Sequence, residues 1–502
     1  MNRFLFALAL CFIPTFASAQ NVKLPKAVDT RVVVVNVGQV LAEYTKAQKF
    51  KRDLEEATAP FDAQVKRHER DIARWQKALD EQEFIAHSEK ELRATLAVAR
   101  KQLATLQADL EGEIAKFKEK QVPPIWQNIQ AAIKAEAIAH KIDLVLGHGD
   151  PTDAKKLDHF DNVHRKMQAM DLGGTVPLYV SPRANLSRAV IARLNGTATK
   201  VGSRGGVRVA VVNVGAVFHG FEKAIRVKQE LIATLEPFKE SARKHLQVIR
   251  EGEEKLLLKD FENVPEDQLR ANVKNARKQL ENLENKARDL LGKKQEDNLV
   301  LLWVELQNAI KTYAQACDID IVLGYGEPLE EKLFQGLDNI TRKRRAMNSG
   351  ISVPLYVGGN AEIAPGVLLF LNQPNKKHDA PRWTTASRVT LVNMVTVYSQ
   401  YQHAKELRKE EQEQRALGAK IHAVWHEIQK GINAIASEQR TTLALGHGAS
   451  PLLSTAPRYD DVNRLLHAMD CGAMLPLYFN SSIEHAPAVV DLLNASRDPK
   501  RK

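Results

Sequence analysis

Hydrophobic and polar positions along this chain follow two patterns that return three times. The first pattern is a short run rich in β-branched residues: RVVVVNVGQVLAEY (Arg31–Tyr44), RVAVVNVGAVFHGF (Arg208–Phe221) and RVTLVNMVTVYSQY (Arg388–Tyr401). Each run predicts a buried strand that ends at an asparagine and continues into helix-like sequence. We interpret these asparagines as caps of the helices that follow them: Asn36, Asn213 and Asn393.

The second pattern is helical and amphipathic. In the first copy, apolar residues recur at helical spacing, and charged residues fill the other positions. The apolar residues are Phe61, Val65, Ile72, Trp75 and Leu79. A capping box at Ser88–Glu91 marks a helix start midway, and the second copy has Pro265 in the matching place. We therefore predict two hairpins of antiparallel coiled-coil helices, at about residues 40–140 and 217–317, with arms roughly 65–70 Å long.

The third copy is shorter between the same landmarks. Arg31 and Gly147 are 116 residues apart, as are Arg208 and Gly324, whereas Arg388 and Gly446 are 58 apart. We predict a shortened hairpin there that turns near Gly418. The predicted fold class is α+β, with three small β heads that each carry an antiparallel helical hairpin, two long and one short.

Three further landmarks repeat at fixed spacing. A tryptophan stands 21 residues before a glycine, a PLY segment begins 30 residues after that glycine, and an asparagine follows 18 residues later. These are Trp126, Trp303 and Trp425; Gly147, Gly324 and Gly446; the PLY tyrosines Tyr179, Tyr356 and Tyr478; and Asn195, Asn372 and Asn494. The repeats define module 1 (31–195), module 2 (208–372) and module 3 (388–494), followed by a basic tail (495–502).

A proline precedes a phenylalanine at the same place in both long hairpins, at Pro60 and Pro237. Proline inside a helix removes a hydrogen bond and bends the helix. One interpretation is a fixed kink that clears the neighbouring module. The other is a hinge that lets the arms spread around an object of variable size.

The repeated glycine lies in GHG, GYG and GHG sequences, which invite comparison with metal and phosphate sites. Tyr325 replaces the histidine found at His148 and His447, and tyrosine does not substitute for imidazole as a zinc ligand or as a base near neutral pH. Proline follows each segment, where a phosphate loop would begin a helix. We interpret the segment as a glycine-permitted turn, and predict no catalytic residue, no metal and no cofactor, hence no enzyme.

Two other recurring residue types have structural interpretations. We expect the tryptophans to pack the last helix of each hairpin onto its head, in preference to forming a ligand site. An arginine recurs as Arg165, Arg342 and Arg464, for which we favour a salt bridge within or between heads over an anion site.

Composition and charge restrict the partners. Aromatic residues are sparse at 6% and charged residues reach 26%, which is typical of exposed charged helices, and the net charge of +11 favours anionic partners such as lipid or nucleic acid. The opening MNRFLFALALCFIPTFASAQN has the arginine, the apolar run and the small-residue site of a secretory signal peptide over residues 1–19, cleaved after Ala19. We therefore expect an exported, soluble protein. An anionic membrane surface remains a candidate partner, and nucleic acid does not.

Removal of the signal peptide leaves two cysteines, Cys317 and Cys471, at different places in the repeat. The sequence is compatible with a single disulfide bridge between them and with two unpaired thiols. The unpaired state is favoured, with each thiol acting as a small hydrophobic residue.

The ordered architecture resembles that of the Skp (OmpH-type) periplasmic chaperones. The residues that carry the resemblance in module 1 are VVVVNVGQVLAEY, AIKAEAIAHKIDLVLG and PLYVSPRANLSRAVIARLN, with counterparts in module 2 and tandem likeness over nearly the whole mature chain. The resemblance implies a homotrimeric holdase whose β heads associate while helical arms enclose unfolded outer-membrane proteins without ATP. It also implies a periplasmic location.

This chain departs from that pattern because it carries three heads, and each head adds a segment such as residues 157–174 whose role stays open. We hypothesise a pseudo-trimer in which the heads of one chain associate with each other. Which arm face is internal is not fixed by sequence, and the candidate client-binding residues are Phe61, Ile72, Trp75, Phe84, Phe238 and Phe261. The alternative is a non-catalytic coiled-coil spacer or adaptor that binds one folded envelope partner.

Overall fold

The structure is a computed structural model that describes most of the three modules. The described residues are 29–81, 88–197, 206–259, 264–334, 336–349, 351–358, 361–373, 386–401, 417–448, 459–471, 473–479, 483 and 486–497. The predicted signal peptide lies outside them, as do the hairpin tips and most of the basic tail. Among the described helices, none is long and apolar enough to cross a membrane.

The described elements follow the same order in each module. Module 1 contains β1 (Val32–Asn36), α1 (Val37–Glu43), α2 (Thr45–Asp80), α3 (Glu89–Ala139), β2 (Leu144–His148), α4 (Ala154–Leu157), α5 (Phe160–Asp171), β3 (Val176–Val180), the 3-10 turn η1 (Pro182–Ala184) and α6 (Ser187–Leu194). Module 2 contains β4 (Val209–Asn213), α7 (Val214–Gly220), α8 (Glu222–Leu258), α9 (Glu266–Cys317), β5 (Ile321–Tyr325), α10 (Glu331–Phe334), α11 (Leu337–Asn348), β6 (Val353–Val357) and α12 (Ala364–Asn372). Module 3 contains β7 (Val389–Asn393), α13 (Met394–Gln400), α15 (Leu417–Glu438), β8 (Leu443–His447), α16 (Tyr459–Asp470), β9 (Leu475–Phe479) and α17 (Ala486–Arg497).

Each long hairpin is the connection between two parallel strands of its head. β1 pairs with β2 in parallel and β4 pairs with β5 in parallel. Parallel neighbours need a crossover connection, usually a helix, and here that connection is drawn out into two helices of 36 to 52 residues. The hairpins are therefore held to the head at both ends by sheet hydrogen bonds.

The third strand of every sheet comes from another module. The sheet orders are β1-β2-β9, β3-β5-β4 and β6-β8-β7, and the strand from the other module always runs antiparallel to the central strand. Module 1 thus gives β3 to module 2, module 2 gives β6 to module 3, and module 3 gives β9 back to module 1. The strand with the PLY segment is the exchanged one in each case, which the repeat analysis did not reveal.

Both faces of each sheet are buried. Alternate side chains of the strands, such as Val32 and Val34 in β1, join one cluster that contains residues of all three sheets. Val33 and Val35 point to the opposite face and join a second cluster, made with the helices. This pattern explains why the strands read as continuous apolar runs instead of alternating ones.

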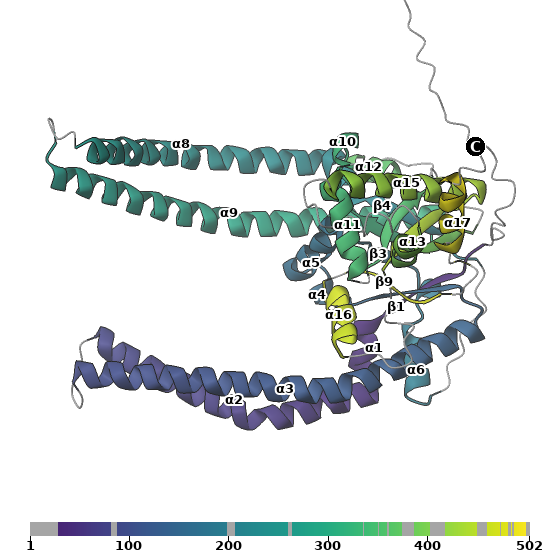
Figure 1. The fold of residues 1–502 in the computed structure, drawn as a ribbon, viewed down its shortest axis with the longest axis horizontal. Helices are drawn as coiled ribbons and strands as arrows, with labels where there is room; N and C mark the ends of the chain where they lie inside the picture. The colour runs from purple at the N-terminus through teal and green to yellow at the C-terminus, as the bar shows by residue number, and fades with distance from the viewer. Residues whose placement is uncertain are drawn as a thin grey trace, which may run out of the picture.

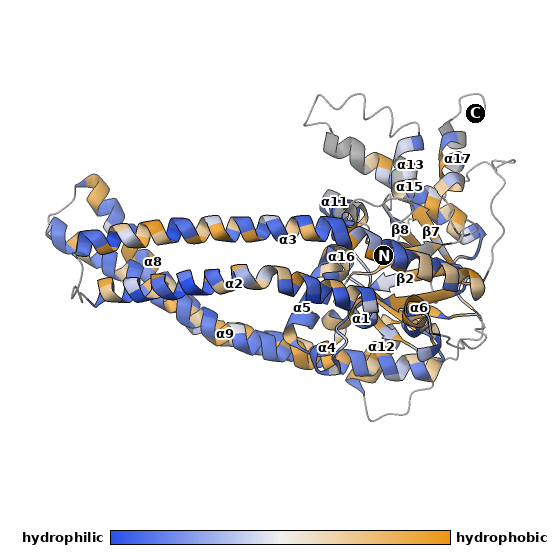
Figure 2. Cartoon of the chain, turned by 90° about the horizontal axis from the view of Figure 1, so that it is seen from below, coloured by the Kyte–Doolittle hydropathy of each residue, from blue (hydrophilic) through white to orange (hydrophobic). Residues whose placement is uncertain are grey.

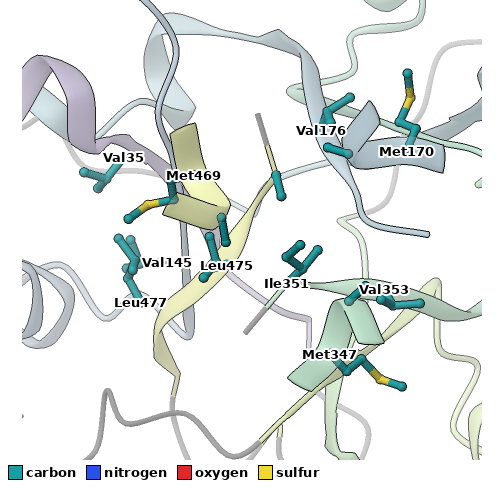
Figure 3. Close-up of a cluster of buried hydrophobic side chains, with 14 of the residues drawn as sticks. Val35, Val145, Met170, Val176, Met347, Ile351, Val353, Met469, Leu475 and Leu477 are labelled. Atoms are coloured by element: carbon teal, nitrogen blue, oxygen red, sulfur yellow. The ribbon is translucent and has the colours of Figure 1, made fainter. Parts of the chain in front are cut away.

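The second cluster continues where the exchanged strands begin. Met170, Met347 and Met469, near the ends of α5, α11 and α16, lie around Val176, Val353 and Leu475 at the starts of the exchanged strands (Figure 3). Backbone hydrogen bonds link the same region in a ring: Thr175 N to Ser352 O (2.9 Å), Ser352 N to Met474 O (2.8 Å) and Met474 N to Thr175 O (2.8 Å). The three modules are arranged cyclically about this point.

The two long hairpins extend from the same side of the head (Figure 1). The helices α5, α11 and α16 lie on that side of the head as well, in both views (Figures 1 and 2). They belong to the inserted segments of the three modules. The fold class is confirmed as α+β, with small β heads and helical hairpins. The shortened hairpin is described only in part, because residues 402–416 lie outside the described ranges.

Candidate functional site

The repeated glycine lies inside a strand, beneath a leucine of another module. A Cβ added to Gly147 would meet Leu477 Cδ1 at 2.3 Å, and one added to Gly324 would meet Leu178 Cδ1 at 2.6 Å. Gly446 stands in the same relation to Leu355. Among the described glycines, only Gly173 and Gly196 have a positive φ. The interpretation of these glycines as a conformationally required turn was therefore wrong: they permit close approach.

The covering leucine is the middle residue of the PLY segment. The pairing of β3 with β5 shifts register between Pro177 and Tyr179, so Leu178 is an extra residue in its strand. The same shift occurs between Pro354 and Tyr356. In β9, Tyr478 and Pro476 pair with consecutive residues of β2, which again leaves Leu477 extra. The bulge and the glycine form one packing motif, with its halves on different modules.

The residue after the glycine differs among modules because its surroundings differ. His148 is buried, and desolvation lowers the pKa of its imidazole to about 4. Its Nδ1 lies 3.5 Å from Asp150 Oδ2, too far for a strong hydrogen bond. In module 2, the Tyr325 hydroxyl donates to Glu362 Oε2 at 2.5 Å. Burial is the dominant cause that raises the pKa of Tyr325, so its hydroxyl is a hydrogen-bond donor and not a base.

Buried charges lie next to these segments. Asp150 accepts from Lys166 Nζ at 2.9 Å and from Arg165 at 2.8 Å. Burial alone would raise the pKa of Asp150, but the charges of Lys166 and Arg165 outweigh burial and keep it below its usual value. In module 2, Glu327 pairs with Lys343 and lies 3.5 Å from Arg342.

The module 3 sequence has Leu465 in place of Lys166 and Ala449 in place of Asp150. The acid and its lysine are absent together, as expected if each buried charge requires the other.

The recurring arginine also ties modules to one another. Arg165 donates to the carbonyls of Met469 (3.1 Å) and Asp470 (3.0 Å) at the C-terminus of α16. Arg342 donates to those of Met170 and Asp171 at the C-terminus of α5 (both 3.1 Å). A cation at a helix C-terminus satisfies carbonyls that lack helical partners. The expected role of this arginine in salt bridges within or between heads is confirmed for Arg165 and Arg342.

Asparagines fix the start of each hairpin. Asn36 Oδ1 accepts from Gln39 N (3.1 Å), and Asn213 and Asn393 cap α7 and α13 in the same way. At the other end of module 1, Asn195 accepts from Thr45 N (3.1 Å) and donates to Glu43 O (3.0 Å). Asn372 makes the same pair of bonds with Glu222 N and Gly220 O. In modules 1 and 2, the terminal asparagine therefore holds the joint where the arm leaves the head.

Tryptophans and PLY tyrosines lie at the head end of the hairpins. Trp126, Trp303 and Trp425 are buried in the cluster shared by helices and sheets. Tyr179 and Tyr356 are half-buried and pack against the same cluster. The backbone of Tyr478 in β9 pairs with that of Val145 in β2. Cys317 and Cys471 are both unpaired.

The helices continue through their prolines. Pro60 lies inside α2 and Pro237 inside α8, so each helix lacks one backbone donor at that point. α3 contains a second pair, Pro123 and Pro124, directly before the buried Ile125 and Trp126. The sequence interpretation did not consider this pair, although adjacent prolines in a helical stretch are a visible signal.

The candidate client-binding residues fall into two groups. Phe61, Ile72, Trp75 and Phe238 are half-buried on the hairpins, and Phe84 and Phe261 lie outside the described residues. More exposed apolar side chains were missed. They are concentrated on the second hairpin: Ile225, Ile232, Leu246, Val248, Leu257, Leu258, Leu290 and Leu301. The first hairpin and its base carry Val98 and Ile138 in this class.

A cavity of ≈ 250 Å³ lies between modules 1 and 2, with Met167, Val214, Phe218 and Arg342 among its lining residues. The Arg342 guanidinium is occupied by carbonyls of α5 and by Gly326 O at 2.8 Å, so it does not present a free anion-binding group. Within the described part of the chain, no cluster of three or more His, Cys, Asp or Glu residues could hold a metal ion.

The features that the structure brings together are long helical hairpins on β heads, exposed apolar side chains on those hairpins and a buried polar network in the head. Residues 31–167 match a family model described as outer membrane protein (OmpH-like). OmpH-like proteins are periplasmic, non-enzymatic chaperones, which agrees with the prediction that the chain is not an enzyme. The match covers residues 31–167 of module 1, without its last strand and helix, and does not extend to the tandem copies. No curated protein and no solved structure matches the chain.

Proposed function

We propose that this chain is an ATP-independent periplasmic holdase that binds unfolded outer-membrane or envelope proteins between its helical arms. The observation that carries the proposal is the placement of two long hairpins on one side of the head (Figures 1 and 2), together with exposed apolar side chains that lie mostly on the second hairpin. The OmpH-like match over 31–167 supports the same function.

The hairpins suit a client that has no fixed shape. Their helices are charged over most of the surface, and exposed aliphatic residues are spaced along them instead of forming one compact patch. A single such contact is weak. A flexible client that touches several of them gains affinity through effective concentration, without needing a complementary folded surface.

We further propose that one chain serves as a pseudo-trimer whose heads associate with each other. Three features support this proposal: the cyclic exchange of β3, β6 and β9, the ring of hydrogen bonds through Thr175, Ser352 and Met474, and the arginine contacts between modules. β9 returns to β2, so the exchange closes without a second chain. The third module would then complete the head while contributing little arm.

The test is to dilute a urea-unfolded outer-membrane β-barrel protein into buffer with the mature chain and without nucleotide. Light scattering follows aggregation, and native mass spectrometry counts the chains in the complex. We expect suppressed aggregation and one chain per client. A three-chain complex would retain the holdase and reject the pseudo-trimer. Unchanged aggregation at several-fold excess of the chain would reject the holdase in favour of an adaptor for a folded partner.

A further inference from the structure

One face of α8 carries aliphatic and charged residues along its whole length, with more basic than acidic ones. Ten positions recur every three to four residues and therefore line one side of the helix. We name them the α8 stripe: Ile225, Lys228, Ile232, Glu236, Lys239, Arg243, Leu246, Arg250, Glu254 and Leu257. All ten side chains are exposed.

The first hairpin is polar at the positions that match the four aliphatic residues. The two modules align without gaps at an offset of 177 residues, from Asn36 and Asn213 through Pro60 and Pro237. The positions on α2 that match the stripe are Gln48, Lys51, Glu55, Ala59, Asp62, Lys66, Glu69, Ala73, Lys77 and Asp80, and these are all exposed too. Each of the four aliphatic residues of the stripe is replaced on α2 by an acid or by glutamine.

Packing within the hairpin does not account for the aliphatic residues of the stripe. Their exposed fractions are 40% for Ile225, 48% for Ile232, 52% for Leu246 and 83% for Leu257. The contact between α8 and α9 uses a different face, where Gly252 lies so close to Val273 that an added Cβ would clash at 2.4 Å. The α2 sequence shows that polar residues are compatible with the same helical position.

We propose that the α8 stripe is the main docking site for client on this chain, and that it binds an extended segment of an unfolded protein that carries apolar and acidic side chains. This inference rests on the proposed holdase function and makes the two long arms unequal. The second hairpin holds the client. The first hairpin, with acids or glutamine at the positions that match the aliphatic residues, contributes less to retaining it.

Charge and spacing select this occupant. At least one basic residue lies between each pair of successive aliphatic residues, so a client segment gains both apolar burial and charge pairing when its acids lie between its apolar residues. A bilayer surface is a poorer match, because a helix lying in a membrane needs a broad continuous apolar face. The stripe is interrupted by charge between each pair of aliphatic residues, and Glu236 and Glu254 would face anionic headgroups.

The test transplants the α2 residues onto α8 in the full mature chain: Ile225→Gln, Ile232→Glu, Leu246→Glu and Leu257→Asp together. The dissociation constant for a fluorescently labelled, urea-unfolded outer-membrane β-barrel is measured for wild type and variant. We expect the variant to bind on the order of tenfold more weakly or worse. The replacements already occupy equivalent helical positions, and circular dichroism and Tm check that the helix is retained.

A matched control changes apolar residues that lie off the stripe. Val248→Asp and Leu290→Glu also introduce the residues of the first hairpin, Asp71 and Glu113, and we expect them to change binding by less than about twofold. The reciprocal variant combines Gln48→Ile, Glu55→Ile, Glu69→Leu and Asp80→Leu. It should restore binding when combined with the transplanted α8.

The outcomes separate the inference from the function beneath it. If wild type binds the unfolded barrel and the transplanted variant binds equally well, the stripe is not the docking site and the holdase stands. If the wild type does not bind the unfolded barrel, both the holdase function and the docking site are rejected. If the variant keeps client binding but loses binding to vesicles of phosphatidylcholine and phosphatidylglycerol, the stripe is a membrane contact and the proposal is overturned.

Discussion

At the residue scale, a glycine of one module and a bulged leucine of another approach each other closely in each sheet. Leu178 comes from module 1 and Gly324 from module 2, and the two are in contact because a bulge adds one residue to β3. A side chain at position 324 would have to displace the leucine from a buried site. The contact therefore links the stability of the second sheet to a strand that another module supplies.

We expect Gly324→Ala to lower the stability of the chain by about 1–3 kcal/mol, because the new methyl group overpacks the contact with Leu178. Leu178→Ala should relieve the clash, so the double variant should lose less than the sum of the single losses. Urea unfolding followed by circular dichroism measures each value. Gly292→Ala is the control: a Cβ at this helical position meets nothing within 4 Å, and the change should stabilise slightly. If the double variant loses as much stability as the two single variants added together, Leu178 and Gly324 are not in contact.

The buried imidazole of His148 makes stability depend on pH. Desolvation lowers its pKa from 6.5 to about 4, so between these values the unfolded chain binds a proton that the folded chain does not. Stability should fall as pH drops from about 6.5 to about 4, by at most roughly 3 kcal/mol. His148→Gln should flatten the Tm profile in this range, whereas the exposed His159→Gln should leave it unchanged. An unaltered profile in His148→Gln would mean that the ring binds its proton equally well in the folded and the unfolded chain.

The sequence identified several of these residues but not their partners. The fixed spacing located Gly147, Gly324 and Gly446, and the tyrosine at 325 argued against a metal or catalytic site shared by the three copies. The reason for the glycines was missed because their covering leucines are supplied by another module. A repeat shows that each copy has a glycine and a leucine. It does not show that they meet across copies.

At the scale of elements, each arm is a crossover connection clamped where it leaves the head. Asn195 and Asn372 bridge the break between a short helix and the long arm helix, with one bond to each side. The long hairpins were predictable because helical periodicity, a capping box and a helix-start proline agreed. The terminal asparagines were found as landmarks, but their contact with a segment about 150 residues earlier has no local signature.

We expect Asn372→Ala to loosen the joint before α8 and to cost about 1–2 kcal/mol, because Glu222 N and Gly220 O both lose their side-chain partner. Hydrogen exchange should quicken at the amides of residues 221–224 while the distal part of α8 keeps its protection. Asn372→Asp retains the acceptor and should protect Glu222 N in part. Equal exchange in wild type and Asn372→Ala would show that the clamp contributes nothing to the joint.

At the scale of the whole molecule, strand exchange makes one module an incomplete unit. Module 1 alone has β1 and β2 with an unfilled edge, and β3 without a sheet to join. The groups that receive β3 in module 2 have equivalents in module 1. Gly147 of module 1 corresponds to Gly324 of module 2. Asp143 corresponds to the buried Asp320, which binds Arg183. Arg165 corresponds to Arg342, which donates a hydrogen bond to a carbonyl at the C-terminus of α5.

A fragment of residues 29–197 should therefore complete itself with its own copies. Each copy would give β3 to the next, and the return of the third strand to the first copy would close the ring, as β9 closes it within the full chain. We expect a homotrimer by light scattering coupled to size-exclusion chromatography, because an open β2 edge favours pairing with any available strand. Gly147→Leu should abolish the trimer by blocking the site for Leu178. A folded monomer would mean that β3 turns back onto its own module, so that cyclic exchange depends on the tandem linkage and is not encoded in each head.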